Sequence, residues 1–336
     1  KNFGETTYTE LLIALAQLSQ EGFTNLVIDL RDNVGGYLDS AVQMANEFLP
    51  KNKLIVYTEG RKSPRREYRT NGQGSYQDIP LVVLINEGSA SASEIFAGAM
   101  QDNDRGTIIG RRSFGKGLVQ QQIAFPDGSM IRLTIARYYT PSGRCIQKPY
   151  TIGDSEDYAQ DIVARYQHGE FFNQDSIKHV GPAYHTTLGR TVYGGGGITP
   201  DIFVPEDTLG MTSYYKQAAM SGLILQFAFN YTDNNRQKMQ QFKELLELES
   251  YLKKQNMVEQ FATYANSHGL QRRNLLIKKS HSLLERYIDS RVIYNMLDEQ
   301  AWNQYLNADD NVIKKALEVF KNNAAFPKLR AKKAKR

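Results

Sequence analysis

The sequence predicts an α/β fold with a central sheet, followed by an all-helical C-terminal region. Short β-branched runs alternate with helical patterns over residues 1–210, as expected when helices pack against strands. Glycine and proline are frequent up to Gly210, but only Gly222, Gly269 and Pro327 follow it. Because these residues interrupt regular structure, we place a domain boundary near residue 210.

The elements of the first domain follow from local patterns. A short apolar run bounded by turn residues predicts a strand, and apolar residues spaced by three and four predict a helix. In chain order we expect a helix over 7–20, a strand over 26–30, a helix over 38–48, strands over 54–58 and 81–85, a helix over 90–102, a strand over 107–109 and a hairpin over 119–139.

Helical spacing dominates residues 211–336. Apolar residues recur there at intervals of three and four, and this is the signature of amphipathic helices. The two clearest series are Met239, Phe242 and Leu246, and then Leu284, Ile288, Val292 and Met296. We therefore expect a helical C-terminal domain that ends in a basic tail.

Composition limits the class of protein. With 336 residues, 41% hydrophobic and 23% charged, the chain has material for a sizeable core, which excludes a mainly disordered protein. The most apolar runs, 26–30 and 81–85, are far shorter than the ~20 residues of a membrane-spanning helix. The single cysteine, Cys145, excludes an intramolecular disulfide and a cysteine-based zinc site.

Charge is distributed unevenly along the chain. Residues 1–210 carry a net charge of −4 and residues 211–336 of +9, which together give the total of +5. Much of the excess lies in 328–336, the composition of a solvated tail. The other basic residues are interleaved with acids, and no nucleic-acid-binding module is visible, so we expect no nucleic-acid partner.

The chain begins immediately before its first predicted helix. No charged n-region with an apolar h-region precedes that helix, as it would in a secretory signal. Because a domain seldom starts at its first crossover, we expect that upstream segments, any signal peptide included, are missing from this chain.

A serine-rich turn is the first candidate for chemistry. Residues 86–94, Asn-Glu-Gly-Ser-Ala-Ser-Ala-Ser-Glu, follow an apolar strand and open a helix. Small side chains there let a carbonyl approach the backbone, and the free amides at the helix start can stabilise an oxyanion. The alternative is an ordinary N-cap, with Ser89, Ser91 or Ser93 as the cap and Glu94 completing a capping box.

A serine nucleophile needs a base, and all five histidines lie outside any recognisable triad context. Lys116, between Gly115 and Gly117, is the other candidate, because a buried neutral amine acts as a general base. Its alternative is a surface lysine in a glycine turn. Residues 110–116 also fit the start of a phosphate-binding loop, but Gly117 replaces the required Ser or Thr, and a strand pattern follows where a helix is needed.

Two further features accompany these candidates. Asp102 lies eleven residues after Ser91, which places it roughly 16 Å away along one helix, so it cannot contact that serine and is expected to pair with Arg105. Gly35 and Gly36 end the first core strand, where their amides can face a bound carbonyl; the alternative is a strand-ending turn.

These segments together resemble one family, the C-terminal processing peptidases or tail-specific proteases, which are serine proteases with a Ser-Lys dyad. The resemblance covers residues 1–210 and includes several ordered motifs. They are Leu-Val-Ile-Asp-Leu-Arg-Asp-Asn-Val-Gly-Gly (26–36), Ser-Ala-Ser-Ala-Ser-Glu-Ile-Phe-Ala-Gly-Ala-Met-Gln-Asp (89–102), Phe-Gly-Lys-Gly-Leu-Val-Gln (114–120), Tyr-Tyr-Thr-Pro-Ser-Gly-Arg (138–144) and Gly-Ile-Thr-Pro-Asp (197–201).

The resemblance implies a role for individual residues. Ser91 corresponds to the nucleophile, Lys116 to the base and Gln120 to the residue that orients the lysine. The amide of Ala92, with one from Gly35 or Gly36, would form the oxyanion hole. Spacing alone does not select Ser91 from its two neighbours.

The resemblance also implies a crotonase/Clp-protease-like core, with 1–210 as catalytic domain, and needs no metal or organic cofactor. The expected partners are protein or peptide substrates with accessible C-terminal tails. Bacterial members are usually exported to the cell envelope or periplasm. Val34 stands where the family often has proline, and the PDZ domain that normally precedes the core is absent from this sequence.

Two alternatives remain open from the sequence. A non-catalytic peptide- or ligand-binding module is compatible with the same fold, although the presence of Ser91, Lys116 and Gln120 argues against it. Residues 211–336 lie outside the motifs, and a dimerisation or docking role for them, including a homo-oligomer, is compatible with protease activity.

Overall fold

The computed structural model describes residues 2–151, 155–179 and 181–326, and the chain divides into two compact units. The first unit comprises Lys1–Glu206 with Lys315–Arg336, and the second comprises Asp207–Lys314. The first is an α/β unit with a central sheet, and the second is helical, so the predicted fold class is confirmed.

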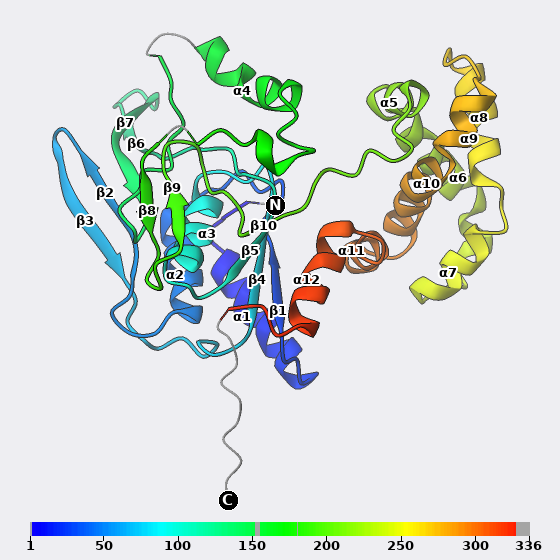
Figure 1. Ribbon diagram of the computed structural model, residues 1–336. Coiled ribbons are helices and arrows are strands. Elements are labelled where there is room, and N and C mark those ends of the chain that lie inside the picture. The colour runs from blue at the N-terminus through cyan, green and yellow to red at the C-terminus, as the bar shows by residue number, and fades with distance from the viewer. Residues whose placement is uncertain (1, 152–154, 180, 327–336) are drawn as a thin grey trace, which may run out of the picture. The chain divides into compact units, whose positions relative to one another are not determined.

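A parallel four-stranded sheet lies at the centre of the first unit (Figure 1). Its strands, in spatial order, are β1 (Leu26–Asp29), β4 (Leu81–Ile85), β5 (Thr107–Gly110) and β10 (Ile202–Phe203). Every side chain of β4 is buried. A central parallel strand is covered on both faces, which explains its continuous apolar sequence.

Three helices complete the core of this unit: α1 (Thr7–Gln20), α2 (Leu38–Phe48) and α3 (Ala92–Asp102). The predicted limits of α1 and α2 are confirmed, whereas α3 begins two residues later than predicted. Helices α2 and α3 pack against each other, and Phe48 and Phe96 meet edge to face with ring centroids 6.0 Å apart. All eleven residues of α3 are buried. This packing fixes the turn that precedes α3.

A second, antiparallel sheet has the order β3-β2-β7-β6. Its strands are β2 (Leu54–Gly60), β3 (Ser63–Arg69), β6 (Leu118–Ala124) and β7 (Met130–Tyr139). The β6–β7 hairpin was predicted, but β3 was not. Strand β3 is an exposed edge strand with the sequence Ser-Pro-Arg-Arg-Glu-Tyr-Arg, and charged edge strands lack the apolar alternation by which strands are recognised.

Several short elements of the first unit were also not predicted. They are α4 (Ser155–Gln167), a 3₁₀ turn (Gln174–Ser176), the two-stranded ribbon of β8 (Ala183–His185) and β9 (Thr191–Tyr193), and β10. The strands among them have only two or three residues, too few for a hydrophobic period to be visible.

The second unit is built around α10. Its helices are α5 (Ser213–Met220), α6 (Leu223–Met239), α7 (Leu245–Leu252), α8 (Met257–Ser267), α9 (Asn274–Lys279), α10 (His281–Met296) and α11 (Glu299–Asn307). The last helix, α12 (Asn311–Lys321), begins in the second unit, and its residues from Lys315 onward belong to the first. Leu284, Ile288 and Val292 are fully buried on α10, as their spacing predicts. The continuous helix expected through Met239 and Leu246 is wrong, because α6 ends at Met239 and a turn separates it from α7.

The end of the described chain returns to the first unit, so residues 315–326 differ from the expectation of one helical segment to the C-terminus. Phe326 and Leu81 form an antiparallel bridge, in which Leu81 N donates to Phe326 O at 3.0 Å. The Phe326 N–H donates to Thr107 Oγ1 at 3.0 Å, and the Arg190 guanidinium lies over its ring. Among the described helices, none has both the length and the apolar character needed to cross a bilayer.

Candidate active site

Ser91 occupies a strained turn between strand β4 and helix α3. Its backbone has φ 55° and ψ −113°, a region that residues other than glycine seldom adopt. The side chain of this serine is half-buried. A backbone in this conformation lifts the residue out of the helix that follows and leaves its side chain accessible, which is the placement a nucleophile needs.

The two neighbouring serines are held differently. Ser89 and Ser93 are fully buried. The Ser89 hydroxyl donates to Leu30 O at 2.7 Å, and the Ser93 hydroxyl donates to Asn33 O at 2.8 Å. Both hydroxyls therefore fasten the turn to the end of β1. Of the three serines that the sequence left equivalent, Ser91 alone is accessible to solvent.

Glu94 connects the serine turn (residues 86–94) to the lysine loop, which is the segment 111–117 between β5 and β6. Its buried carboxylate accepts from Ser91 N at 2.9 Å and from Lys116 N at 2.8 Å through Oε2. Through Oε1 it accepts from Gly115 N at 2.7 Å and from the Ser113 hydroxyl at 2.5 Å. The sequence identified Glu94 only as a capping residue, because its second set of donors lies about twenty residues along the chain.

Burial raises the pKa of the Glu94 carboxyl, and the hydrogen bonds from Ser113, Lys116, Gly115 and Ser91 oppose that shift. All four donors point at an oxygen acceptor, an arrangement that favours the ionised carboxylate. The consequence is structural: a single side chain fixes the backbone of Ser91 relative to the backbone of Lys116.

Gly35 lies directly against the serine turn. With φ 91°, it occupies a conformation that favours glycine, and a Cβ at this position would be 2.7 Å from Ser91 Cβ and 2.8 Å from Ala92 N. Gly36, with φ 150°, is equally confined, because its Cβ would be 2.1 Å from Phe3 O. The two glycines therefore allow close approach of the backbone, and they do not end strand β1, which stops at Asp29.

Backbone donors are available beside Ser91. Within the described part of the chain, no acceptor is recorded for the Ala92 N–H, which lies in the first turn of α3. The Gly35 N–H already donates to Asn33 Oδ1 at 3.0 Å, whereas no acceptor is recorded for that of Gly36 in the same residues. Of these three amides, those of Ala92 and Gly36 thus have no acceptor among the described residues.

Lys116 and Gln120 lie where the loop after β5 enters β6. Lys116 is half-buried, and its backbone is tied to Glu94, while Gln120 is exposed and follows a β-bulge in the pairing with β7. In the described residues no hydrogen bond joins the Ser91 hydroxyl, the Lys116 amine and the Gln120 amide. The structure thus brings the turn and the loop together, and the dyad itself stays a prediction. Catalytic hydrogen bonds are often long before substrate binds.

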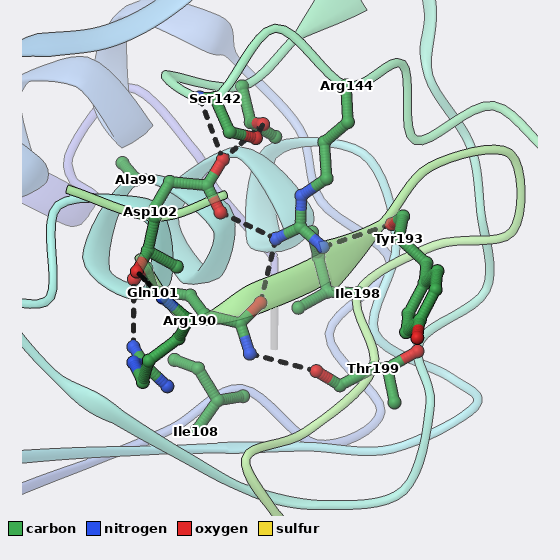
Figure 2. A network of polar contacts seen from close by, with 12 residues as sticks. Ala99, Gln101, Asp102, Ile108, Ser142, Arg144, Arg190, Tyr193, Ile198 and Thr199 are labelled. Atoms are coloured by element: carbon green, nitrogen blue, oxygen red, sulfur yellow. Dashed lines mark hydrogen bonds and ion pairs between the residues drawn. The ribbon is translucent and has the colours of Figure 1, made fainter. Parts of the chain in front are cut away.

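Asp102 has a different partner from the one expected. Figure 2 shows its carboxylate facing Arg144. Asp102 Oδ1 and Arg144 Nη2 are 2.8 Å apart, and both side chains are fully buried. Thr140 Oγ1 and Ser142 N also donate to Asp102 Oδ2. Arg105 instead donates to backbone carbonyls of Phe48 and Tyr76. The expected pairing with Arg105 is therefore wrong. Asp102 still has a structural role, because its buried carboxylate binds Arg144, Thr140 and Ser142.

The same network explains two of the sequence motifs. Arg144, at the end of 138–144, also donates to Gln101 Oε1 at 2.7 Å. The Gln101 amide donates to Thr199 O at 2.9 Å and to Asp201 Oδ1 at 2.8 Å, both in 197–201. Figure 2 shows Arg144, Gln101 and Thr199 meeting at the end of α3. These contacts hold the C-terminal end of α3, while Ile198 N also donates to Ser113 Oγ at 2.7 Å, the hydroxyl that bonds Glu94.

Two family models match the chain. Residues 1–157 match the model described as peptidase family S41, and residues 214–298 match a family of unknown function, DUF8443. The sequence is 44% identical over 146 residues to a carboxyl-terminal-processing protease of Synechocystis sp., covering 44% of this chain and 34% of that protein. It is 40% identical over 159 residues to a chloroplastic C-terminal processing peptidase of Tetradesmus obliquus, covering 47% of this chain and 33% of that one.

Among solved structures, the chain is similar to a photosystem II D1 C-terminal processing protease, with 30% identity and a TM-score of 0.44 over 62% of this chain and 42% of that chain. The chain spans about a third of the length of the curated relatives named above. The family resemblance predicted from the motifs is confirmed.

Proposed function

Residues 1–157 belong to peptidase family S41, and from this premise we propose that the chain carries the catalytic domain of a serine endopeptidase that cleaves proteins near flexible C-terminal tails. The observation that carries the proposal is the accessible Ser91 on a strained turn, beside the unpaired amide of Ala92. The names of the curated relatives, which are carboxyl-terminal-processing proteases, support the choice of substrate.

The proposed mechanism uses Ser91 as nucleophile and neutral Lys116 as base. Lys116 Nζ takes the proton from Ser91 Oγ while that oxygen attacks the scissile carbonyl, and the ammonium then delivers the proton to the leaving amine. Water hydrolyses the acyl-enzyme by the reverse relay. The Ala92 N–H and the N–H of a glycine stabilise the tetrahedral oxyanion. Gly36 is favoured as that glycine, because the Gly35 N–H already donates to Asn33 Oδ1. Gln120 orients the lysine.

The sheet offers a place for the substrate chain. Strand β6 is an outer strand of the antiparallel sheet and begins two residues after Lys116. An extended peptide can pair with such an edge through its main chain, and the scissile bond would then pass the serine turn. We propose this edge as the substrate-binding strand.

The decisive experiment is covalent labelling with a fluorophosphonate probe of active serines. We expect labelling of the intact chain at Ser91, its loss in Ser91→Ala, and a fall in peptide cleavage of roughly a thousandfold or more in that variant. Ser89→Ala and Ser93→Ala are matched controls, because their hydroxyls are buried. Equal labelling of the intact chain and Ser91→Ala would place the reactive serine elsewhere, and no labelling of the intact chain would leave the non-catalytic binding module as the interpretation.

A second experiment tests the base. Lys116→Arg should abolish cleavage, because a guanidinium stays protonated and cannot accept the serine proton. The fold should persist, since the backbone N–H of Lys116 makes the bond to Glu94. Lys62→Arg, at the exposed β2–β3 turn, is the control for the same change in side chain. Retained cleavage in Lys116→Arg would exclude lysine as the base.

We also propose that the protein is exported to the cell envelope or periplasm, as the family resemblance implies. Fractionation of the producing cells tests this directly, with recovery in the cytoplasmic fraction as the contrary result.

A further inference from the structure

A groove in the helical unit lies outside the catalytic apparatus. Its volume is about 610 Å³, and helices α6, α8 and α10 line it. The lining residues are Leu225, Gln226, Phe229, Asn230, Tyr264, Arg291, Tyr294 and Asn295. On α6 and on α10 these residues recur at intervals of three and four, so each helix presents one continuous stripe to the groove.

Large apolar side chains of this groove are exposed. Leu225 is 45% exposed, Phe229 61% and Tyr294 46%, although a buried core lies directly behind them. Isolated exposed apolar residues are common, but several that line one hollow mark an interaction site. The groove therefore has the apolar surface to bind aliphatic or aromatic side chains.

Amide side chains alternate with these apolar groups. The Asn230 amide reaches Tyr264 Oη at 3.4 Å, the Tyr264 hydroxyl reaches Gln226 Oε1 at 3.5 Å, and the Asn295 amide reaches Thr232 Oγ1 at 3.4 Å. All three bonds are long, so a ligand can replace them at little cost. Carboxamides both donate and accept, which suits the N–H and C=O groups of an extended peptide.

Arg291 supplies the only charge among the eight lining residues. Within the residues that the structure describes, its guanidinium forms no ion pair, and its buried Nε has no hydrogen-bond partner. Its Cζ lies 5.3 Å from the ring centre of Tyr287 and 5.3 Å from that of Trp302, so the two aromatic residues hold the side chain in place. A fixed, uncompensated guanidinium is complementary to a carboxylate.

We propose that this groove binds the C-terminal end of an extended peptide, with apolar side chains against Leu225, Phe229 and Tyr294 and the terminal carboxylate on Arg291. The carboxylate explains the unpaired guanidinium, and the peptide main chain explains the weakly bonded amides. Such a site deepens the proposed function, because it would hold a protein tail on the unit next in sequence to the protease. Binding is independent of cleavage, so the two proposals can fail separately.

The single tryptophan of the chain makes the test direct. Trp302 lies against Arg291 and meets Tyr294 edge to face, with ring centroids 5.7 Å apart. The experiment titrates the full chain, carrying Ser91→Ala to prevent cleavage, with an acetylated six-residue peptide that ends in three leucines and contains no aromatic residue. We expect a saturable change in tryptophan emission, and roughly tenfold weaker binding for the same peptide with a C-terminal amide.

Two variants and one control assign the site. Arg291→Gln should bind the acid and amide forms equally weakly, whereas Arg286→Gln, on α10 but outside the groove, should retain the preference for the acid. Phe229→Ala should weaken both forms. Calorimetric titration repeats each comparison without relying on Trp302, and the amidated peptide tests the carboxylate even where Arg291→Gln does not fold.

Three outcomes would overturn the proposal. Equal affinity for the acid and the amide excludes recognition of a terminal carboxylate. Unchanged affinity in Arg291→Gln places binding elsewhere, including at the protease edge strand. A concentration-dependent dimer in sedimentation that Phe229→Ala dissociates, with no peptide binding by the monomer, assigns the groove to a second copy of the chain.

Discussion

The turn before α3 shows how backbone geometry, rather than residue type, distinguishes one serine from two others. Ser89 and Ser93 use their hydroxyls to bind the end of β1, and Ser91 is turned outward by a positive φ. Gly35 must be a glycine for this to happen, because the turn packs directly on its Cα. The strain at Ser91 is sustained by the surrounding bonds, above all those of Glu94.

Gly35→Ala tests this close packing. The added methyl group would lie 2.5 Å from Ala90 O and against Ser91, so we expect cleavage to fall by on the order of a hundredfold or more as the turn and the oxyanion donors shift. Gly22→Ala is a matched control, since Gly22 also has a positive φ but nothing lies within 4 Å of its missing Cβ. Peptide cleavage assays of the two variants decide the point. Similar activities in both would show that Gly35 matters only for its backbone conformation.

At the scale of elements, helix α3 is anchored from both ends. Glu94 fastens its first turn to the lysine loop, and Asp102 fastens its last turn to Arg144. Both anchors are buried and both reach segments distant in sequence. The helix therefore transmits the positions of two loops to the serine turn, and damage at its far end is expected to destabilise the whole unit.

Arg144→Met measures the second anchor. Removal of the guanidinium leaves the Asp102 carboxylate buried without its partner, which typically costs about 3–5 kcal/mol of unfolding free energy. For a unit of this size that lowers the melting temperature by roughly 6–20 °C in scanning calorimetry. Arg69→Met removes an exposed ion pair to Glu67 on β3 and should cost less than about 1 kcal/mol. Equal shifts in the two variants would show that the buried pair contributes nothing specific.

At the scale of the whole molecule, the chain carries two separate hydrophobic cores, one in the α/β unit and one in the helical unit. The second contains an unusual buried group, Asp289 on α10, whose Oδ1 has no hydrogen-bond partner among the described residues. Burial, with the charges of Glu285 and Glu249, raises the pKa of Asp289 to about 7, while Lys253 opposes the shift. Burial raises the pKa of Tyr231 on α6 and of Tyr305 on α11, and the charge of Asp289 adds to both shifts.

The stability of the helical unit should therefore depend on pH. Because the folded pKa lies above the unfolded value of 3.8, the folded unit retains a proton that the unfolded chain releases between about pH 4 and pH 7, and stability falls as pH rises through this window. Asp289→Asn removes the charge, so it should stabilise the unit by on the order of 4 kcal/mol at pH 8 and by little at pH 4. Calorimetry at both pH values measures the difference. A stabilisation that is the same at pH 4 and pH 8 would contradict the titration of Asp289.

The structural features that depend only on neighbouring residues could be predicted from the sequence. Apolar spacing and turn residues located α1, α2 and β4 to the residue, and they placed Ser91 on a strand-to-helix turn and Lys116 in a loop before a strand, as the structure has them. Only the folded structure showed the long-range partners: Arg144 for Asp102, the lysine loop for Glu94 and Leu81 for Phe326. Local patterns reflect period and backbone preference over a few residues, whereas these pairings join segments tens to hundreds of residues apart. Their geometry is set by the packing of the whole unit, and a pattern along the chain carries no information about that packing.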